Sequence, residues 1–415
     1  MSTDPNIVVG GGQAGARAAQ SMRQAGFAGR IIVFGDEVHL PYERPPLSKE
    51  VFLRGPDAGF KPILTHEFYQ EQNIELRRGV HVEAIDRQAQ RIVLEDGSAL
   101  PFNRLLLATG SRLRRLQLEG AEKSNVFYLR TIDDSVALEA MLSGGSRLMI
   151  VGGGFIGLEL AAAAQQRGCN IVVIEAGHHI MGRVAPPVVA SYVADCHAAR
   201  GVTIKTGVFP IALAGDANIH SVTLSDGETL PVDIMVVGIG VVPRTELAER
   251  AGLAVENGIS VDESCVTSDP GIFAAGDVAN QFNPTVRCRL RQESYQNAQD
   301  QGVTAGTAMA GGRPATRPSV PWAWSDQYDL NIQVAGMRLP SDEVVIRGDV
   351  ASGSFTAFSL FERRLRGAVT VNRGREMTLI NRLLLRGEPI DTAALSSESV
   401  SLREVSSLPS TIGTF

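Results

Sequence analysis

The sequence lacks the cysteine spacings that bind metals or form redox-active pairs. Its 415 residues include only four cysteines, at Cys169, Cys196, Cys265 and Cys288. No two of them are spaced as C-x-x-C or C-x-x-x-x-C, so neither a metal site nor a redox-active dithiol is expected.

The sequence also lacks a long apolar run, a basic leader and an excess of positive charge. The apolar stretch Leu148–Ala164 is interrupted by four glycines and by Glu159, so no membrane-spanning helix is expected. The first residues carry no basic region, which predicts no signal peptide and a cytoplasmic protein. A net charge of −6 argues against a general binder of nucleic acid. Neither nucleic acid nor a membrane is therefore an expected partner.

What the sequence does contain is the motif VGGG-x-x-G, twice, at Val9–Gly15 and Val151–Gly157. Each copy follows a short apolar run and opens into an alanine-rich segment, the pattern of a strand, a glycine turn and a helix N-terminus. The glycines permit the tight turn and the close approach of the backbone, and the helix dipole attracts a pyrophosphate. The two copies predict two dinucleotide sites on one chain; the alternative is two glycine-rich turns without a ligand.

The second copy is followed by an acid at the spacing of a ribose contact. Glu175 ends the apolar run Ile171–Ile174, and its distance in sequence from Gly152 fits a hydrogen bond to the ribose 2′-hydroxyl of NAD. The next residues, 176–179, contain no arginine that could bind a 2′-phosphate. The sequence therefore predicts NADH rather than NADPH.

The length of the chain predicts two or three domains. Continuous apolar runs at Leu105–Ala108 and Ile234–Pro243 predict buried strands, the second with a glycine exit. The composition of Gly311–Pro318 is that of a linker. Beyond it, alternating segments predict a small antiparallel sheet domain, and the serine-rich tail after Ser396 is expected to be loosely held.

Six motifs carry a family resemblance along nearly the whole chain. They are LPYERPPLSK (Leu40–Lys49), LLLATGS (Leu105–Ser111), VGGGFIGLELA (Val151–Ala161), VVGIGVVP (Val236–Pro243), SDPGIFAAGDVA (Ser268–Ala279) and PWAWSDQY (Pro321–Tyr328). In this order they resemble the ferredoxin reductases that serve aromatic-ring dioxygenases and bacterial haem-thiolate monooxygenases. Apoptosis-inducing factor and monodehydroascorbate reductase are similar at the first motifs.

The resemblance implies an α/β fold of the glutathione-reductase type. It would consist of two Rossmann-like dinucleotide-binding domains and a small α+β C-terminal domain. The FAD-binding domain would comprise residues 1–109 and 241–318, the NAD-binding domain residues 110–240, and the C-terminal domain residues 319–415.

The resemblance also implies the residues of the site. Lys49 and Glu159 would lie near the flavin N5 and the nicotinamide, and Trp324 beside the isoalloxazine ring, as the catalytic residues. FAD would be bound by Gly10, Gly12, Ala14, Gly15, Asp36, Arg44, Lys49, Val82, Arg130, Asp277, Tyr295 and Trp324. The nicotinamide nucleotide would be bound by Gly152, Gly154, Ile156, Gly157, Glu159, Glu175, Arg183 and Gly240. For Val82 and Tyr295 the alternative is core packing.

The implied activity is transfer of a hydride from NADH to FAD and then of single electrons to a 2Fe–2S ferredoxin that supplies an oxygenase. A flavin is required because nicotinamide gives electrons in pairs and the cluster takes one. Arg287, Arg289 and Arg291 form an alternating basic stripe that either receives an acidic ferredoxin or is a solvated face. The alternatives are a reductase of rubredoxin or of a small-molecule acceptor, and a redox-sensing NADH-binding flavoprotein. A monomer or weak dimer is expected.

Overall fold

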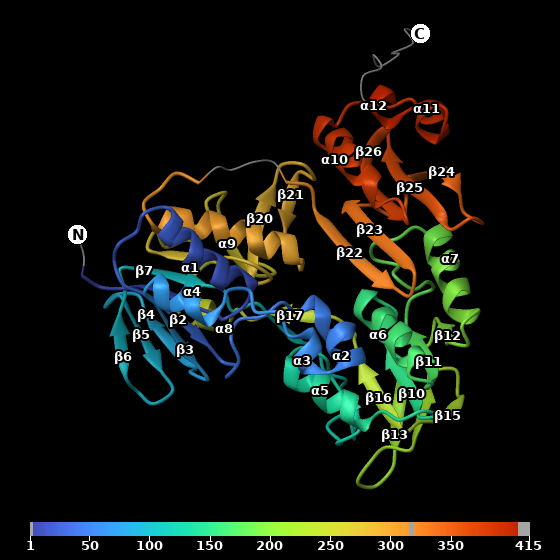
Figure 1. Ribbon diagram of the computed structural model, residues 1–415, viewed down its shortest axis with the longest axis horizontal. Coiled ribbons are helices and arrows are strands. Elements are labelled where there is room, and N and C mark those ends of the chain that lie inside the picture. Colours follow the sequence, from blue (N-terminus) through green and yellow to red (C-terminus); the bar gives the residue numbers. More distant parts are fainter. Residues whose placement is uncertain (1–2, 315–318, 406–415) are drawn as a thin grey trace. The chain divides into compact units, whose positions relative to one another are not determined.

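The computed structural model describes residues 3–314 and 319–405, which divide into two compact units (Figure 1). Unit 1 comprises Met1–Glu43, Phe60–Arg112 and Val241–Ser319. Unit 2 comprises Arg44–Gly59, Leu113–Gly240 and Val320–Phe415. The segment 44–59 thus belongs to unit 2, although the chain on either side of it belongs to unit 1. The division into three domains stays a prediction.

Unit 1 is built on a five-stranded parallel sheet with the strand order β19–β7–β1–β2–β3. Its strands are β1 (Asn6–Val9), β2 (Ile31–Gly35), β3 (Ile74–Arg78), β7 (Arg104–Leu107) and β19 (Ile272–Ala274). Helices α1 (Gln13–Gln24) and α9 (Tyr295–Met309) pack closely against each other. The predicted strand at Leu105–Ala108 is confirmed as β7, which is apolar because it lies buried within the sheet, between β19 and β1.

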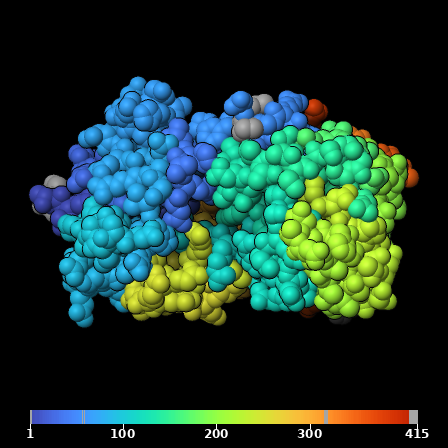
Figure 2. Space-filling view, turned by 90° about the horizontal axis from the view of Figure 1, so that it is seen from below, coloured from blue at the N-terminus to red at the C-terminus, as the bar shows by residue number. Residues whose placement is uncertain are grey.

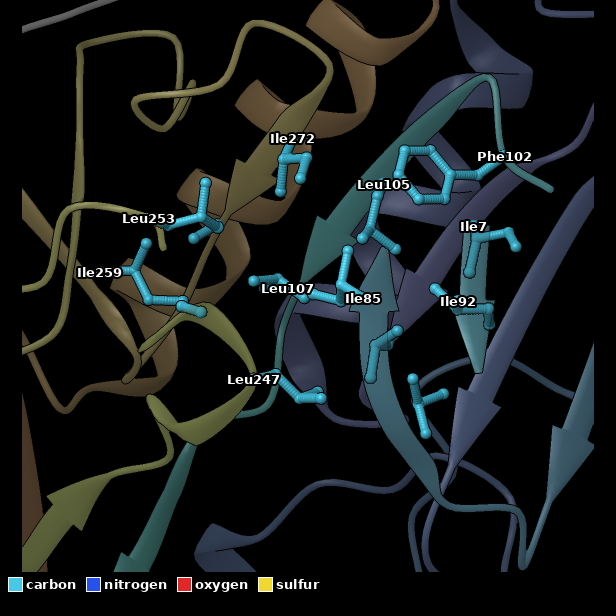
Figure 3. Close-up of a cluster of buried hydrophobic side chains, with 14 of the residues drawn as sticks. Ile7, Ile85, Ile92, Phe102, Leu105, Leu107, Leu247, Leu253, Ile259 and Ile272 are labelled. Carbon is cyan, nitrogen blue, oxygen red and sulfur yellow. The ribbon is translucent and has the colours of Figure 1, made fainter. Parts of the chain in front are cut away.

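A hydrophobic cluster joins the parallel sheet to smaller elements of unit 1 (Figure 3). Ile7, Leu105 and Ile272 of the parallel sheet meet Ile92 and Ile259 in this cluster. Other elements of unit 1 are the helices α4 (His66–Glu71) and α8 (Glu246–Arg250) and the strands β4 (Val82–Asp86), β5 (Arg91–Leu94), β6 (Ala99–Pro101), β18 (Ile259–Val261), β20 (Ala279–Asn283) and β21 (Cys288–Leu290). These strands form a β4–β5–β6 sheet and a β18–β20–β21 sheet.

Unit 2 repeats the parallel sheet, with the strand order β12–β11–β10–β16–β9. Its strands are β9 (Val126–Phe127), β10 (Arg147–Val151), β11 (Asn170–Glu175), β12 (Thr203–Thr206) and β16 (Ile234–Val237). Its helices are η1 (Pro45–Ser48), α2 (Glu50–Arg54), α3 (Pro56–Gly59), α5 (Ile132–Met141), α6 (Phe155–Gln166) and α7 (Pro187–Ala198). An antiparallel sheet of β13 (Pro210–Ala214), β14 (Ser221–Leu224) and β15 (Thr229–Pro231) reaches the surface, in yellow-green in Figure 2.

The predicted antiparallel sheet beyond the linker is confirmed, with the strand order β22–β23–β26–β25–β24. Its strands are β22 (Trp322–Gln327), β23 (Leu330–Gly336), β24 (Glu343–Asp349), β25 (Ser354–Phe361) and β26 (Arg364–Val371). Phe355 on one face packs toward Val189 of α7, and Phe358 on the other face packs toward Ile380, which belongs to a helix after the sheet. The helices on this second face are α10 (Met377–Arg386), α11 (Thr392–Ser396) and α12 (Leu402–Val405), preceded by η2 (Gly374–Glu376).

The structure differs from expectation in two places. The apolar run 234–243 is two strands, because the chain turns through Gly240 at φ +95° before β17 (Val241–Pro243), which pairs with β8 (Ser111–Leu113). The expectation of a loosely held tail after Ser396 is wrong as far as residue 405. Leu402 and Val405 are buried, and the Arg347 guanidinium donates hydrogen bonds to the carbonyl oxygens of residues 395, 397 and 400.

The two parallel sheets and the antiparallel sheet confirm the predicted α/β fold class. The predicted linker lies partly outside the described residues, at 315–318, as does the end of the tail, at 406–415. Within the described ranges, no helix combines the length and the apolar character needed to cross a membrane.

Candidate functional site

The first glycine loop lies between β1 and α1 in unit 1. Gly10 has φ +124°, and a Cβ there would lie 2.0 Å from the carbonyl oxygen of Ala108. A Cβ at Gly15 would lie 2.0 Å from the oxygen of Gly10. Gly12, by contrast, begins α1 without a side-chain capping bond and has open space where a Cβ would stand. With Ala14 buried in the first turn, the loop leaves helical N–H groups facing an open position, which suits an anion.

The second glycine loop repeats this geometry between β10 and α6 in unit 2. Gly152 has φ +116°, and a Cβ there would lie 2.3 Å from the oxygen of Gly238. A Cβ at Gly157 would lie 2.1 Å from the oxygen of Gly152, whereas Gly154 has open space. Ile156, in the first turn of α6, is 53% exposed, so an apolar side chain stands beside this second anion position.

Glu175 ends β11 and is held against the second loop by two backbone groups. Its Oε2 accepts a hydrogen bond from Gly153 N at 2.8 Å, and its Oε1 accepts one from Gly177 N at 2.7 Å. The carboxylate is therefore fixed next to the loop, where a ribose bound there would meet it.

Asp36 follows β2 and is engaged by the Arg244 guanidinium and the His81 ring, both of unit 1. Its Oδ2 accepts a hydrogen bond from Arg244 at 2.7 Å, and its Oδ1 lies 3.3 Å from His81 Nδ1. The carboxylate is about half exposed. A ribose hydroxyl would thus have to share this carboxylate with the Arg244 guanidinium, whereas at Glu175 it would share the carboxylate with two backbone N–H groups. The assignment of Asp36 to the adenosine ribose stays a prediction.

Three other predicted FAD contacts lie in unit 1. Asp277, which follows β19, accepts a hydrogen bond from Ser111 Oγ at 2.9 Å. Tyr295, the first residue of α9, donates a hydrogen bond to Glu43 at 2.8 Å. The Val82 side chain lies in the hydrophobic cluster of Figure 3, which leaves only its backbone available for a ligand.

The remaining predicted contacts lie in unit 2. Arg44 donates a hydrogen bond to the carbonyl oxygen of Arg130 at 2.6 Å, so these two predicted FAD-binding residues are neighbours. Arg183 is exposed and approaches Gly240, where the nearest atom to a Cβ would be an Arg183 guanidinium nitrogen at 3.8 Å.

The structure brings the predicted catalytic residues of unit 2 together. Lys49 Nζ lies 3.1 Å from Glu159 Oε1 and 3.7 Å from Asp326 Oδ2. Glu159 also accepts hydrogen bonds from Ser48 Oγ at 2.5 Å and from Ser325 Oγ at 2.8 Å. Burial raises the pKa of the Glu159 carboxyl, while Lys49 and the two hydroxyls oppose that rise. Both carboxylate oxygens therefore have donors, which hold the group and the ammonium that pairs with it.

Trp324 is the third member of this cluster. Lys49 Nζ lies 5.9 Å from the centre of its ring, and Trp322 stacks on it with ring centres 5.1 Å apart. Trp322 also donates a hydrogen bond from Nε1 to Gln333. The two indoles are half-buried and lie on the same face of β22.

Sequence reasoning missed Ser48 and Ser325, the two hydroxyl donors to Glu159. The available signal was position, since Ser48 precedes Lys49 and Ser325 follows Trp324. In β22 the polar side chains of Ser325 and Gln327 are buried while the tryptophans are more exposed, which is the reverse of the usual alternation. Serines in such a strand are buried only if another segment offers them an acceptor, and here Glu159 does.

The expected basic stripe is not uniform. Arg287 and Arg289 are exposed, and Arg289 donates a hydrogen bond to the oxygen of Asn280. Arg291 pairs with Glu293 at 2.6 Å, and its side chain is only 9% exposed. A docking role for the stripe stays a prediction, carried by the first two arginines.

The four cysteines all lie within the described residues and none is in a disulfide. Cys169 and Cys265 are buried, and burial raises the pKa of the Cys265 thiol to about 12, so it stays protonated near neutral pH. Within residues 3–314 and 319–405, no group of three histidine, cysteine or acidic side chains could hold a metal ion.

The sequence matches two family models. One is described as pyridine nucleotide-disulphide oxidoreductase and matches residues 5–302. The other is described as reductase C-terminal and matches residues 322–406. Together they account for the two glycine loops and for the antiparallel sheet.

The chain is similar to several reductases over nearly its full length. It is 41% identical over 404 residues to the ferredoxin–NAD(+) reductase component of the anthranilate 1,2-dioxygenase system of Burkholderia cepacia, which covers 97% of this chain and 99% of that one. Rhodocoxin reductase of Rhodococcus erythropolis is 40% identical over 386 residues, covering 92% and 90%. Putidaredoxin reductase, solved in a covalent complex with putidaredoxin, aligns with a TM-score of 0.94 at 34% identity and covers 98% of both chains.

Proposed function

The chain belongs to the pyridine nucleotide-disulphide oxidoreductase family, and we propose that it oxidises NADH and passes the electrons singly, through FAD, to a small 2Fe–2S ferredoxin that supplies an oxygenase. The predicted family of ferredoxin reductases and the predicted enzyme class are confirmed. FAD and NADH are its cofactors, as predicted. The observation that carries the proposal is the pair of glycine loops, one in each unit, built with the same close approaches of the backbone. The names of the similar reductases support ferredoxin as the acceptor.

The residues present fit two dinucleotides. At each loop the glycines whose Cβ would collide with backbone oxygen alternate with one glycine that faces open space, which is the cradle a pyrophosphate requires. We assign the first loop to FAD and the second to NADH, because Glu175 stands beside the second. When bound, FAD accepts an electron pair as a hydride and returns the electrons one at a time.

We assign the Lys49–Glu159 pair to the hydride-transfer site. Hydride transfer needs no acid or base, so the role of the pair is to fix a positive charge and to exclude water. Glu159 holds the Lys49 ammonium at 3.1 Å, and the Trp324 ring flanks it. A lysine held in this way keeps one orientation while the two cofactors are placed.

Purified protein is expected to be yellow and to release one FAD per chain on denaturation. NADH should bleach the flavin rapidly in stopped flow, and a 2Fe–2S ferredoxin should restore its colour while carrying electrons to cytochrome c. Release of FMN, or protein without flavin, would contradict the proposal. Faster turnover with rubredoxin or a small acceptor would favour that alternative. A reduced complex that persists with every acceptor would favour a redox sensor.

We place this reaction in the cytoplasm, where NADH is available, and propose that the protein acts as a monomer or weak dimer. Sedimentation at the micromolar concentrations of an enzyme assay tests the second point.

Gly15→Ala and Gly12→Ala should separate two effects in the first loop. In Gly15→Ala the new Cβ would lie 2.0 Å from Gly10 O, so the loop must move and both FAD and stability should be lost. In Gly12→Ala the Cβ meets no protein atom within 4 Å, so the fold should remain while FAD binding weakens. Loss of one charge-assisted hydrogen bond, about 1.5–3 kcal/mol, corresponds to a roughly ten- to hundredfold weaker affinity.

The measurements for these two variants are the FAD-to-protein ratio and the melting temperature. Gly144→Ala, in an open turn of unit 2, is the matched control. If both loop variants kept full FAD occupancy, the assignment of FAD to the first loop would be wrong.

Trp324→Ala should slow ferredoxin-dependent cytochrome c reduction about tenfold, or about 1.4 kcal/mol of barrier, and NADH-to-ferricyanide turnover much less. The reason is that ferricyanide is small and needs no docked route, whereas we propose that the indole lies between the flavin and a docked cluster. The exposed Phe361→Ala is the control in the same sheet. Trp322 is half-buried and stacks on Trp324. Trp322→Ala should therefore lower the stability less than replacement of a fully buried tryptophan would, and it should also disturb Trp324. Equal losses in both assays for Trp324→Ala would place this residue in FAD binding or folding instead.

A further inference from the structure

A line of buried hydrogen bonds leads away from Glu159, starting at the carboxylate oxygen Oε1 that also pairs with Lys49. Ser325 Oγ donates to Glu159 Oε1 at 2.8 Å, and Gln327 Nε2 donates to Ser325 Oγ at 3.0 Å. Gln327 Oε1 lies 2.9 Å from His197 Nε2, and His197 Nδ1 lies 3.4 Å from the Tyr328 hydroxyl. The first three side chains, Ser325, Gln327 and His197, are fully buried. All of these residues belong to unit 2.

The charge on Glu159 fixes the direction of every bond in this line. A carboxylate only accepts, so Ser325 must use its single hydroxyl proton on Glu159 and can only accept from Gln327. Gln327 must therefore present its NH2 group to Ser325 and its carbonyl oxygen to His197. His197 must then carry its proton on Nε2, which leaves Nδ1 as an acceptor for Tyr328. One buried charge thus selects one tautomer of a histidine that is three hydrogen bonds away along the line.

The surroundings of His197 suit the neutral ring that this arrangement requires. Burial lowers the pKa of His197 and outweighs the hydrogen bond with Gln327, which raises it; the nearby Arg200 guanidinium lowers it further. Burial also raises the pKa of Tyr328 to about 12, so its hydroxyl keeps the proton that it donates. Arg200 lies over the Tyr328 ring at 4.5 Å and pairs with Asp329 at 2.7 Å. These two residues carry the charges at the outer end of the line.

The line is built to orient groups rather than to conduct protons. The Gln327 amide has no proton that it can pass on without forming an unstable tautomer, so the line is interrupted there for proton transfer. Hydrogen bonds that all point the same way polarise one another, and each fixes the rotamer of the next. A displacement of His197 is therefore transmitted to Ser325 and from there to the carboxylate.

We propose that His197 is a positioning residue for Glu159, which acts through Gln327 and Ser325 and thereby sets the place of the Lys49 ammonium. The inference rests on the proposed role of Lys49 and Glu159 in NADH oxidation. It adds to that role a buried histidine on α7 and a glutamine on β22 that touch neither cofactor loop.

The tautomer is measured directly by 15N NMR of the holoenzyme with 15N-labelled histidine. His197→Gln removes one signal and so identifies it, and the exposed His220→Gln controls for unspecific changes. Nε2–H is expected in the wild type. In Ser325→Ala the direction is no longer imposed, and the signal should shift toward a mixture of tautomers. An Nδ1–H tautomer in the wild type, or an unchanged signal in Ser325→Ala, would overturn the inference.

The kinetic readout separates positioning from folding. His197→Leu and Ser325→Ala should each lower the rate of flavin reduction by NADH about tenfold with little change in KM, since neither residue is part of the second glycine loop, to which we assign NADH. His197→Gln keeps an N–H donor near the Nε2 position and should restore most of the rate. If His197→Leu does not fold, Ser325→Ala, which deletes one oxygen, carries the test.

Failure of this inference can be told from failure of the proposed function. Slow flavin reduction in Glu159→Gln with wild-type rates in His197→Leu and Ser325→Ala would overturn the inference alone. Wild-type rates in Glu159→Gln would overturn the assignment of Glu159 to the hydride-transfer site, and the positioning role would fall with it.

Discussion

Replacing Glu175 with alanine is expected to reduce the preference for NADH over NADPH by about a hundredfold. The carboxylate is held by Gly153 N and Gly177 N, so it cannot swing away from an incoming 2′-phosphate. Two like charges forced together cost several kcal/mol, and about 3 kcal/mol corresponds to a factor of roughly a hundred. In the alanine variant, Gly153 N–H and Gly177 N–H are also free to donate hydrogen bonds to the 2′-phosphate. The measurement is kcat/KM for both cofactors in wild type and variant.

Two further variants sharpen this test. Glu175→Gln removes the charge at nearly constant shape, but its single amide oxygen can accept from only one of the two backbone groups. It should therefore show part of the change. Glu228→Ala, which removes an exposed partner of Lys205 on the β14–β15 turn, should leave the preference as it is. Equal use of both cofactors by the wild type would refute the role of Glu175.

Lys49→Met should lower the free energy of unfolding by about 3–5 kcal/mol, since it leaves a buried carboxylate without its cation. The Glu159 side chain is 6% exposed, so water cannot replace the lysine. The double variant Lys49→Met/Glu159→Leu should recover much of this loss because no charge then remains to be buried. The matched control is Lys205→Met, which breaks an exposed ion pair and should cost about 0–1 kcal/mol.

The cost of Lys49→Met should also depend on pH. Burial raises the pKa of Glu159, and removal of Lys49 raises it further. In the unfolded chain a glutamate ionises near pH 4.3 or so, which means that the folded variant holds its proton to a higher pH than the unfolded one. Stability is therefore retained at low pH and falls as the pH rises through the folded pKa of Glu159. If denaturant titrations show no such fall in the free energy of unfolding, or a loss no larger than in Lys205→Met, then Lys49 does not compensate a buried charge on Glu159.

The parts of the site that the sequence predicted are those set by local geometry. At Gly10 and Gly152 φ is positive and an added Cβ would collide with a carbonyl oxygen, so only glycine fits and the sequence shows it at that position. The acid at Glu175 likewise follows from the length of one strand, one turn and one helix. Such rules act over about 30 residues, and periodicity and glycine spacing record them.

The parts that the sequence did not predict depend on distant segments. From the sequence alone, Ser325 and Gln327 resemble the solvent-facing polar residues of an edge strand. They are buried because β22 packs on α6 with that face. His197 reads as one polar residue near the end of a helix. Residues 397–405 of the serine-rich segment are held in place because Arg347, some 50 residues earlier, donates hydrogen bonds to the carbonyl oxygens of residues 395, 397 and 400. No local pattern carries these pairings.

The interruption of unit 1 by unit 2 has a consequence for biosynthesis. Strand β7 pairs with β1 on one side and with β19 on the other, and about 160 residues separate β7 from β19 in sequence. At a translation rate of about 5–20 residues per second, one edge of this nascent sheet stays unpaired for roughly 8–30 seconds. Helix α1 waits longer for α9, its packing partner. Chaperones that bind unpaired strand edges can act in this interval. A chain truncated after β7 but before β19 would expose that edge permanently to other molecules.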